Sequence, residues 1–284
     1  MKQRIITGVL AAVVFIGALF CMNLKIPVFA AFLAFLCAAA VWEVEHAVGL
    51  RNKLIYGASL VLSAAVPFLV NYGVKIPVAA FGSAYVILIF VFMLFEFEKT
   101  KFEQAVTAIF ASVCIPFSFS LMLVFRDADK NFAGFSRTDG IFLILFAYFS
   151  AWMTDIFAYF VGSKFGKHKL CPKISPKKSV EGAVGGVVGC ILLNLALFAV
   201  FKKFFFDAGE TGLSYLSVAL ISVPLSIVGM FGDLAASTIK RNFGIKDFSN
   251  ILPGHGGIMD RFDSVLFVMP TLFAAVTLME RFVR

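Results

Sequence analysis

Four side chains at the end of one apolar segment have the types and spacing of a phosphate and metal site. Asp233, Ser237 and either Lys240 or Arg241 are spaced to lie along one face of a helix. That face would offer a carboxylate, a hydroxyl and a cation. Carboxylate oxygens suit a hard cation such as Mg²⁺, and cationic side chains neutralise charge on phosphoryl oxygens. The pattern therefore predicts chemistry on phosphate groups.

The segment that follows, residues 246–263, extends this pattern with glycines and two more carboxylates. The run Leu-Pro-Gly-His-Gly-Gly around His255 lets the backbone approach a ligand closely. Asp260 and Asp263 are three residues apart and can share a helix face. His255 lacks Cys or His partners at ligand spacing, so zinc is excluded. On its own it would be a hydrogen-bonded loop histidine, but among these residues we expect it to contact substrate.

A fourth candidate carboxylate, Asp155, lies inside a long apolar segment. Tyr159 and Gly162 follow it at i+4 and i+7, so a polar stripe is expected on one helix face. A helix-packing hydrogen bond or an interfacial position would also explain an aspartate here. An unpaired carboxylate in hydrocarbon costs several kcal/mol, and intramembrane carboxylates usually mark function. We therefore interpret Asp155 as a site residue.

The loop that follows Asp155, residues 162–182, contains six lysines, three glycines and two prolines. Basic loops often contact anionic headgroups, so basic content alone would favour that simpler interpretation. However, Ser179 is expected to cap a helix whose first turn contains Glu181. A helix N-terminus beside Lys177 and Lys178 is a plausible phosphate site. The spacing of the glycines and lysines does not match a P-loop.

These segments are embedded in a very apolar chain. Of its 284 residues, 61% are hydrophobic and 15% are charged, whereas soluble domains are about half apolar and a quarter charged. The apolar residues form blocks near the length that spans about 30 Å of hydrocarbon as a helix. We expect an all-α, polytopic transmembrane helix bundle with about nine spans, at residues 5–24, 26–42, 54–71, 76–95, 104–125, 140–162, 181–201, 214–236 and 264–279.

Sixteen of the 25 lysines and arginines fall on one side of these spans. The positive-inside rule then makes the N-terminus cytosolic and turns both basic loops, residues 163–180 and 238–262, toward the cytosol. Residues 1–139 form the expected N-terminal helices and residues 140–284 the catalytic region. In the first region, Glu43, Glu45 and His46 are interpreted as a solvated helix end. The net charge of +8 fits anionic lipid or a polyanionic substrate, whereas nucleic acid is excluded because no soluble basic domain or tail is present.

Taken together, the polar motifs resemble the signature of the phosphatidate cytidylyltransferase family, also called CDP-diacylglycerol synthases. The signature reads Ser, two residues, Lys-Arg, four residues, Lys-Asp, then a small residue, Pro or Gly, His-Gly-Gly, and Asp-Arg-x-Asp. The fixed positions are met from Ser237 to Asp263, by Ser237, Lys240, Arg241, Lys246, Asp247, Ser249, Leu252, Pro253, His255, Gly256, Gly257, Ile258, Asp260, Arg261 and Asp263. The stretches around Asp155 and Ser175–Ser179 also resemble this family, which often has Thr at the position of Ser179.

The resemblance implies that the phosphate of phosphatidic acid attacks the α-phosphorus of CTP, giving CDP-diacylglycerol and pyrophosphate with Mg²⁺, and K⁺ as a further cation. It implies an integral protein of the bacterial inner (cytoplasmic) membrane, surrounded by membrane lipids, with its active site facing the cytosol and with a homodimer as an expected assembly. The expected catalytic residues are Asp233, Asp260, Lys240 and Arg241. The expected metal ligands are Asp233, Asp260, Asp155 and Asp263, and the expected substrate-binding residues are Ser237, Lys177, Lys178, Ser179, Lys246, His255 and Arg261.

Three other functions are weighed against this one. A transporter would also carry intramembrane carboxylates, but its expected inverted repeat is not apparent. A phosphotransferase that consumes CDP-lipids would resemble Asp-Gly-x-x-Ala-Arg, and that hexapeptide does not occur. A CTP-dependent enzyme acting on another lipid, such as an isoprenoid alcohol or an archaeal ether lipid, is the nearest alternative.

Overall fold

The computed structural model describes residues 13–14, 16–23, 27–206, 211–254 and 256–283. In these residues, eight helices are long and apolar enough to cross a membrane. They are α2 (Val28–Ala47), α3 (Lys53–Asn71), α4 (Val78–Phe95), α5 (Phe102–Arg126), α7 (Arg137–Phe165), α8 (Val180–Phe204), α9 (Tyr215–Asn242) and α10 (Met259–Val283). The short elements are η1 (Cys21–Asn23), η2 (Phe97–Lys99) and α6 (Ala128–Asn131), and the strands are β1 (Lys169–Cys171) and β2 (Ser175–Ser179). The protein is therefore an integral membrane protein, and the predicted all-α polytopic fold is confirmed.

The eight predicted spans from residue 26 onward each correspond to one of these helices. Half of the first predicted span, residues 5–24, lies outside the described residues. Helices α2 and α9 continue beyond their predicted ends, to Ala47 and Asn242. Hydropathy detects only the apolar part of a helix, so turns that carry charged residues at the membrane surface escape it. The extension of α9 places Lys240 and Arg241 on the same helix as Asp233 and Ser237, as their spacing predicted, although the predicted span had ended at residue 236.

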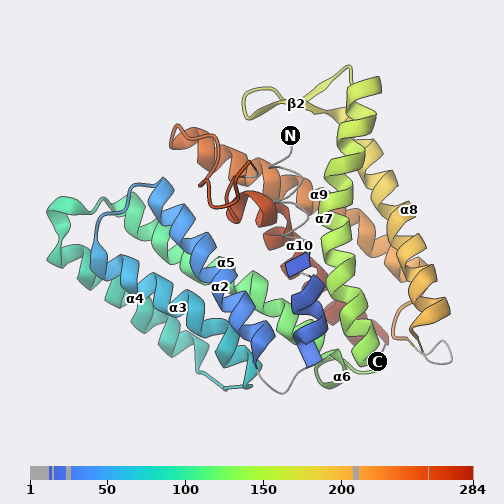
Figure 1. The fold of residues 1–284 in the computed structure, drawn as a ribbon, viewed down its shortest axis with the longest axis horizontal. Helices are drawn as coiled ribbons and strands as arrows, with labels where there is room; N and C mark the ends of the chain where they lie inside the picture. The colour runs from blue at the N-terminus through green and yellow to red at the C-terminus, as the bar shows by residue number, and fades with distance from the viewer. Residues whose placement is uncertain (1–12, 15, 24–26, 207–210, 255, 284) are drawn as a thin grey trace. The chain divides into compact units, whose positions relative to one another are not determined.

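The chain divides into two compact units, residues 1–123 with 242–262, and residues 124–241 with 263–284. The predicted regions, 1–139 and 140–284, were continuous in sequence, whereas each unit combines two separate segments. In the first unit, α2 and α3 pack side by side (Figure 1). Asn52 caps α3 with its side-chain oxygen, and its amide nitrogen donates to the Phe92 carbonyl (2.8 Å) and the Thr100 hydroxyl (3.0 Å). These bonds join the start of α3 to the end of α4.

The end of α2 differs from its interpretation as a solvated helix terminus. That interpretation is wrong for Glu43 and Glu45, which are both fully buried. It is right for His46, which is exposed and stacks on the Trp42 ring at 5.2 Å. A buried carboxylate requires hydrogen-bond donors, and the donors to Glu43 lie more than 200 residues further along the chain. The neighbouring sequence could not reveal them.

The second unit is organised by α7 and α8, which pack side by side along most of their length (Figure 1). Glycines on α8 make this close approach possible, because a Cβ at Gly185 or Gly189 would overlap Val161 or Phe157. A buried polar network also joins α7, α8 and α9. Its centre is Asn194, whose amide donates to the hydroxyls of Ser150 (3.0 Å) and Ser222 (3.1 Å).

A second bond across the same helices joins the Thr154 hydroxyl on α7 to the Ser226 hydroxyl on α9 at 2.9 Å. Interhelical hydrogen bonds of this kind fix the register of helices in a membrane, where apolar contacts alone are not selective. Thr154 directly precedes Asp155, and Asp233 lies two turns beyond Ser226. The network therefore aligns the two helices that carry these carboxylates.

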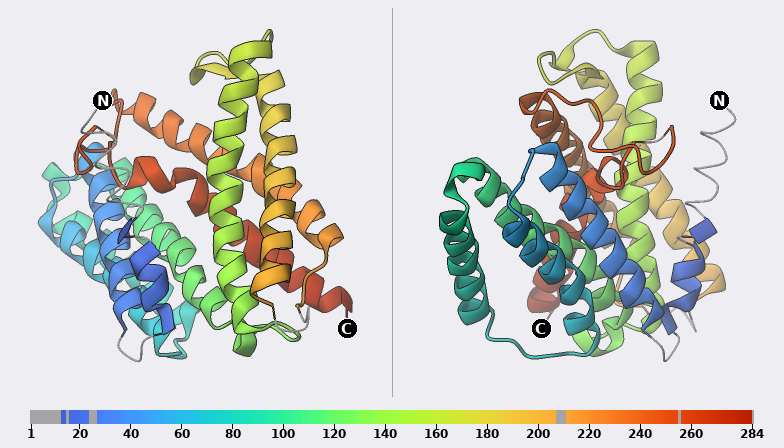
Figure 2. Two further views of the ribbon diagram at one scale, coloured as in Figure 1. Left: turned by 45° about the vertical axis from the view of Figure 1, so that its right-hand side comes forward. Right: turned by 60° about the vertical axis from the view of Figure 1, so that its left-hand side comes forward.

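The α7–α8 connection is a small antiparallel hairpin of β1 and β2, at the ends of the two helices (Figure 2). The sequence predicted a structured loop here but not the strands. Three- and five-residue strands with Pro176 and two lysines in the second give almost no strand signal. The hairpin depends instead on contacts at its base, which also form one wall of the candidate site.

Candidate active site

Ser179 ends β2 and caps α8, as the sequence predicted. Its hydroxyl accepts a hydrogen bond from the Gly182 backbone N–H at 3.2 Å. Three glycines surround this hydroxyl. A Cβ added at Gly162, Gly166 or Gly182 would lie 2.7–2.9 Å from it. Larger residues would therefore separate the hairpin from the end of α7 and the start of α8.

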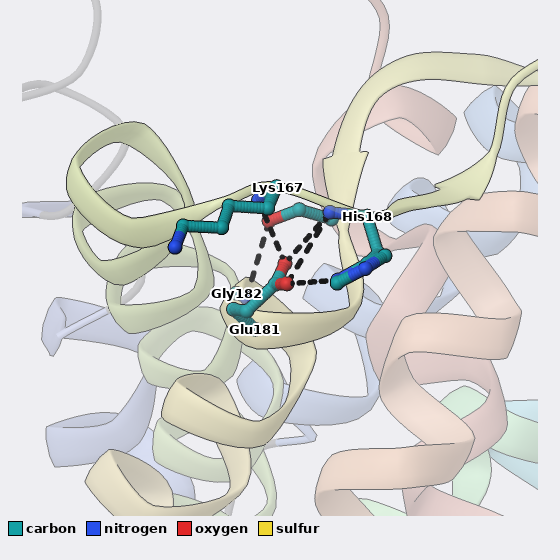
Figure 3. A network of polar contacts seen from close by, with 5 residues as sticks. Lys167, His168, Glu181 and Gly182 are labelled. Carbon is teal, nitrogen blue, oxygen red and sulfur yellow. Dashed lines mark hydrogen bonds and ion pairs between the residues drawn. The ribbon is translucent and has the colours of Figure 1, made fainter.

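Glu181, which the sequence placed in the first turn of α8, closes the other side of the hairpin (Figure 3). Its carboxylate accepts the backbone N–H groups of Lys167 (3.1 Å) and His168 (3.2 Å). It also contacts Nδ1 of the His168 ring at 2.6 Å. Two successive backbone N–H groups and a side chain thus hold the beginning of the loop against the helix that follows it.

The hairpin covers a cavity of about 300 Å³ within the second unit. Its lining is amphiphilic. Charged and polar groups come from α7, β2 and α9, and apolar groups come from α7, β1, α8 and α9; the lining residues are Asp155, Ala158, Tyr159, Leu170, Ser175, Lys177, Lys178, Ser179, Ala183, Met230 and Asp233. Five residues that the sequence nominated as site residues therefore meet here, namely Asp155, Lys177, Lys178, Ser179 and Asp233.

Lys178 is the central charge of this cavity. Its ammonium nitrogen lies 2.5 Å from Asp233 Oδ2 and 3.7 Å from Asp155 Oδ1. The Lys178 side chain is 20% exposed, so the three charges are partly withdrawn from water. Their attraction is stronger there than that of a surface ion pair. Lys177 also lines the cavity but makes no ion pair among the described residues.

A third carboxylate, Asp263 on α10, lies close enough to interact electrostatically with Asp155 and Asp233, and also with Lys240. It is 8% exposed, and one of its oxygens accepts the Ser264 backbone N–H at 2.7 Å. Gly232 makes this arrangement possible, because a Cβ there would lie 2.8 Å from the Asp263 carbonyl oxygen. Helices α9 and α10 therefore bring Asp233 and Asp263 close together.

The described residues contain no group of three or more His, Cys, Asp or Glu side chains arranged to hold a metal ion. Among the carboxylates of this unit, Asp155 and Asp233 share one cation, the ammonium of Lys178. In this mostly apolar cavity, which five elements line, the lysines can bind a phosphate and the two carboxylates can bind its counter-ion.

The chain matches the sequence pattern of the cytidylyltransferase family over residues 2–279. The chain belongs to the cytidylyltransferase family. The phosphatidate cytidylyltransferase of Bacillus subtilis (strain 168) is 34% identical over 286 residues, which cover 98% of this chain and 98% of that protein. The phosphatidate cytidylyltransferases of Staphylococcus haemolyticus (strain JCSC1435) and Staphylococcus aureus (strain COL) are each 44% identical over 137 residues, which cover 48% of this chain and 50% of those proteins. Membership makes the protein a nucleotidyltransferase.

The signature residues of this cytidylyltransferase are divided between its two units. Ser237, Lys240 and Arg241 lie on the last turns of α9 in the second unit. Ser237 and Lys240 are half-buried and Arg241 is exposed, and none of the three lines the cavity. Lys240 interacts electrostatically with Asp263.

The signature residues from Lys246 to Arg261 belong to the first unit, where Lys246 and Arg261 are exposed, whereas Asp263 belongs to the second. His255 lies outside the described residues. Asp260, predicted as a metal ligand, has a clear local role. Its Oδ2 accepts the backbone N–H groups of Phe248 (2.9 Å) and Gly257 (3.0 Å). Asp260 therefore closes the loop between α9 and α10, which we call the signature loop, on itself. Its role as a metal ligand stays a prediction.

Two residues that matter for this geometry were not predicted as site residues. Glu43 is hydrogen-bonded to the signature loop, and its position at the end of a predicted span gave no sign of that contact. Met230 contributes apolar lining beside Asp233. It lies three residues before Asp233 on the same helix, so the stripe through Asp233 could have included it.

Proposed function

We propose that the protein transfers CMP from CTP to phosphatidic acid, giving CDP-diacylglycerol and pyrophosphate. The observation that carries this proposal is the Lys178 ammonium group held between Asp155 and Asp233, in an amphiphilic cavity of a cytidylyltransferase-family protein. Full-length similarity to a phosphatidate cytidylyltransferase supports phosphatidic acid as the acceptor. Tyr159, Leu170 and Met230 give the cavity an apolar side suited to a lipid, beside the lysines suited to its phosphate.

In this reaction, a phosphate oxygen of phosphatidic acid forms a bond to the α-phosphorus of CTP. The bond from that phosphorus to the oxygen bridging the β-phosphorus breaks, and pyrophosphate leaves with the electron pair. The attacking phosphate is already an anion near pH 7, so no strong general base is needed. Catalysis then depends on positioning two polyanions and on neutralising their charge. His255 is accordingly assigned to substrate binding rather than to proton transfer.

The residues of the cavity fit a divalent cation. Asp155 and Asp233 present hard oxygen ligands around one positive charge, and Asp263 is their electrostatic neighbour. Bound Mg²⁺ would neutralise charge on the triphosphate. With Asp155 and Asp233 holding that cation, Lys178 would be released from them and, with Lys177 and Ser179, would bind phosphate oxygens. Ser237, Lys240, Arg241, Lys246, Arg261 and Asp260 keep the roles that the signature predicts for them, and K⁺ is proposed as a second cation.

We place the enzyme in the bacterial inner membrane with the basic loops facing the cytosol, where CTP is available, and propose a homodimer as its assembly. The excess of lysine and arginine on one side of the helices supports this orientation. Purified protein supplied with radiolabelled CTP, phosphatidic acid and Mg²⁺ should form a CDP-lipid and an equal amount of pyrophosphate. Absence of both products would refute the proposed activity. Activity with another lipid but not with phosphatidic acid would show that phosphatidic acid is not the acceptor, while CTP would remain the donor.

A further inference from the structure

Glu43, near the end of α2, is fully buried. Among the described residues, the hydrogen-bond donors to its carboxylate all lie in the signature loop and at the start of α10. Its Oε1 accepts the hydroxyl of Ser249 (2.6 Å) and the backbone N–H of Ile258 (2.8 Å). Its Oε2 accepts the backbone N–H of Met259 at 2.7 Å. All of these residues belong to the first unit. Both oxygens of one carboxylate are therefore committed to the same segment.

Two of these donors are the N–H groups at the beginning of α10. The first N–H groups of a helix have no partner within the helix, and a negative charge there interacts favourably with the helix dipole. Such capping usually comes from a residue just before the helix. Here it comes from a residue 216 positions away in sequence. Glu43 on α2 thus caps the first turn of α10 within the first unit.

The loop is built to let Glu43 reach these donors. A Cβ at Gly257 would lie 2.5–2.6 Å from the Glu43 carboxylate, so any other residue would displace it. Gly256 has a φ of +81°, a conformation that glycine adopts without strain. Asp260 holds the same loop from its other side through Phe248 and Gly257. Two carboxylates therefore fix the loop, one from within the signature and one from a distant helix.

We infer that Glu43 is a positioning residue, which holds the signature loop and the first turn of α10 in the conformation needed for turnover. Among the described residues it makes no ion pair, so its charge is balanced by hydrogen-bond donors. An amide cannot replace it. The single oxygen of a glutamine could keep Ser249 and Ile258, but its NH₂ group would then face the Met259 N–H, which is also a donor. The consequence for turnover depends on the proposed cytidylyltransferase reaction.

The test uses Glu43→Gln in the full-length protein, with Glu45→Gln as the matched control. Glu45 lies on the same helix and is also fully buried, but its carboxylate accepts none of the hydrogen bonds from the signature loop or the start of α10 that Glu43 accepts. In Glu43→Gln, hydrogen exchange at the amides of residues 257–260 should accelerate at least tenfold, and kcat should fall about 10- to 100-fold. Glu45→Gln should leave both within about twofold of wild type. Unchanged exchange at residues 257–260 in Glu43→Gln, or an equal loss of kcat in the control, would overturn the inference.

A second variant covers the case in which Glu43→Gln does not fold. Ser249→Ala removes one of the three bonds, so by itself it should accelerate exchange at residues 257–260 and lower kcat, each by less than Glu43→Gln; wild-type exchange in Ser249→Ala would overturn the inference. Where Glu43→Gln folds, the effect of Ser249→Ala should largely disappear in that background. If the fold-losses of kcat in Ser249→Ala and Glu43→Gln multiplied in the double variant, the two residues would act independently, and a role of Glu43 through this loop would be contradicted. The exchange measurement requires no turnover. If wild-type protein made no CDP-lipid, the proposed function would fail while the positioning of the loop by Glu43 would still be tested.

Discussion

Replacing Lys178 by methionine should strengthen metal binding while weakening catalysis. Methionine has a similar length and no charge, so the change removes the ammonium between Asp155 and Asp233 and little else. A divalent cation would then reach the aspartates without displacing a lysine. Lys178 would also be missing as a phosphate ligand in turnover. The two effects have opposite signs, so a general loss of structure cannot produce both.

The magnitude follows from the distances of 2.5 and 3.7 Å between the Lys178 nitrogen and the two carboxylates. At an effective dielectric constant of about 20, the gross attractions are about 7 and about 4 kcal/mol. The side chains of Lys178, Asp233 and Asp155 are 20%, 28% and 41% exposed, so solvent screening and desolvation remove most of this. A net contribution of about 1.5–3 kcal/mol for a charged hydrogen bond corresponds to about a 10- to 100-fold change in affinity.

The assay is Mn²⁺ binding to nucleotide-free protein in detergent, followed by electron paramagnetic resonance of the free ion. Lys178→Met should lower the Kd for Mn²⁺ at least tenfold, and kcat/KM for CTP should fall about 100-fold. Lys177→Met is the matched control, because Lys177 lines the same cavity without an ion pair among the described residues. It should leave Mn²⁺ affinity within about twofold. An unchanged or weaker affinity in Lys178→Met would refute the assignment of Asp155 and Asp233 as metal ligands.

Three further substitutions test the parts that position the cavity. Gly182→Ala should reduce activity at least tenfold and lower the unfolding temperature, because its Cβ would lie 2.9 Å from the Ser179 hydroxyl. The control Gly57→Ala, at an exposed position of α3 with open space around it, should change neither. Glu181→Gln weakens the bonds to the Lys167 and His168 N–H groups, so KM for both substrates should rise at least threefold; an unchanged KM would show that the hairpin does not need this contact. Asn194→Ala should cost about 1–2 kcal/mol in unfolding measured in detergent, and no loss would mean that the α7, α8 and α9 network is not stabilising.

Much of the fold followed from composition and periodicity. Long apolar blocks fix helices in a membrane, because every backbone polar group must be paired within the segment itself. The cap of α8 was predictable because a capping side chain acts within a few residues, as Ser179 does at the Gly182 N–H. The contacts of Glu181 with Lys167 and His168 cross the hairpin and were not predicted. The β1–β2 hairpin was not predicted. Its strands are too short to show a pattern, and its stability comes from the Ser179 and Glu181 contacts at its base.

The sequence by itself determined which residue types could do chemistry here: the signature contains enough fixed positions to identify the family. It could not determine which of these side chains meet, because that depends on residues far apart in the chain. Only the tertiary structure brings Lys178 between Asp155 and Asp233, two residues that lie on different helices and 78 positions apart in the sequence. It likewise shows that Glu43 is no solvated helix end but a buried acceptor for donors more than 200 residues away. Helix formation is a local property, whereas pairing a buried charge requires partners that only folding supplies.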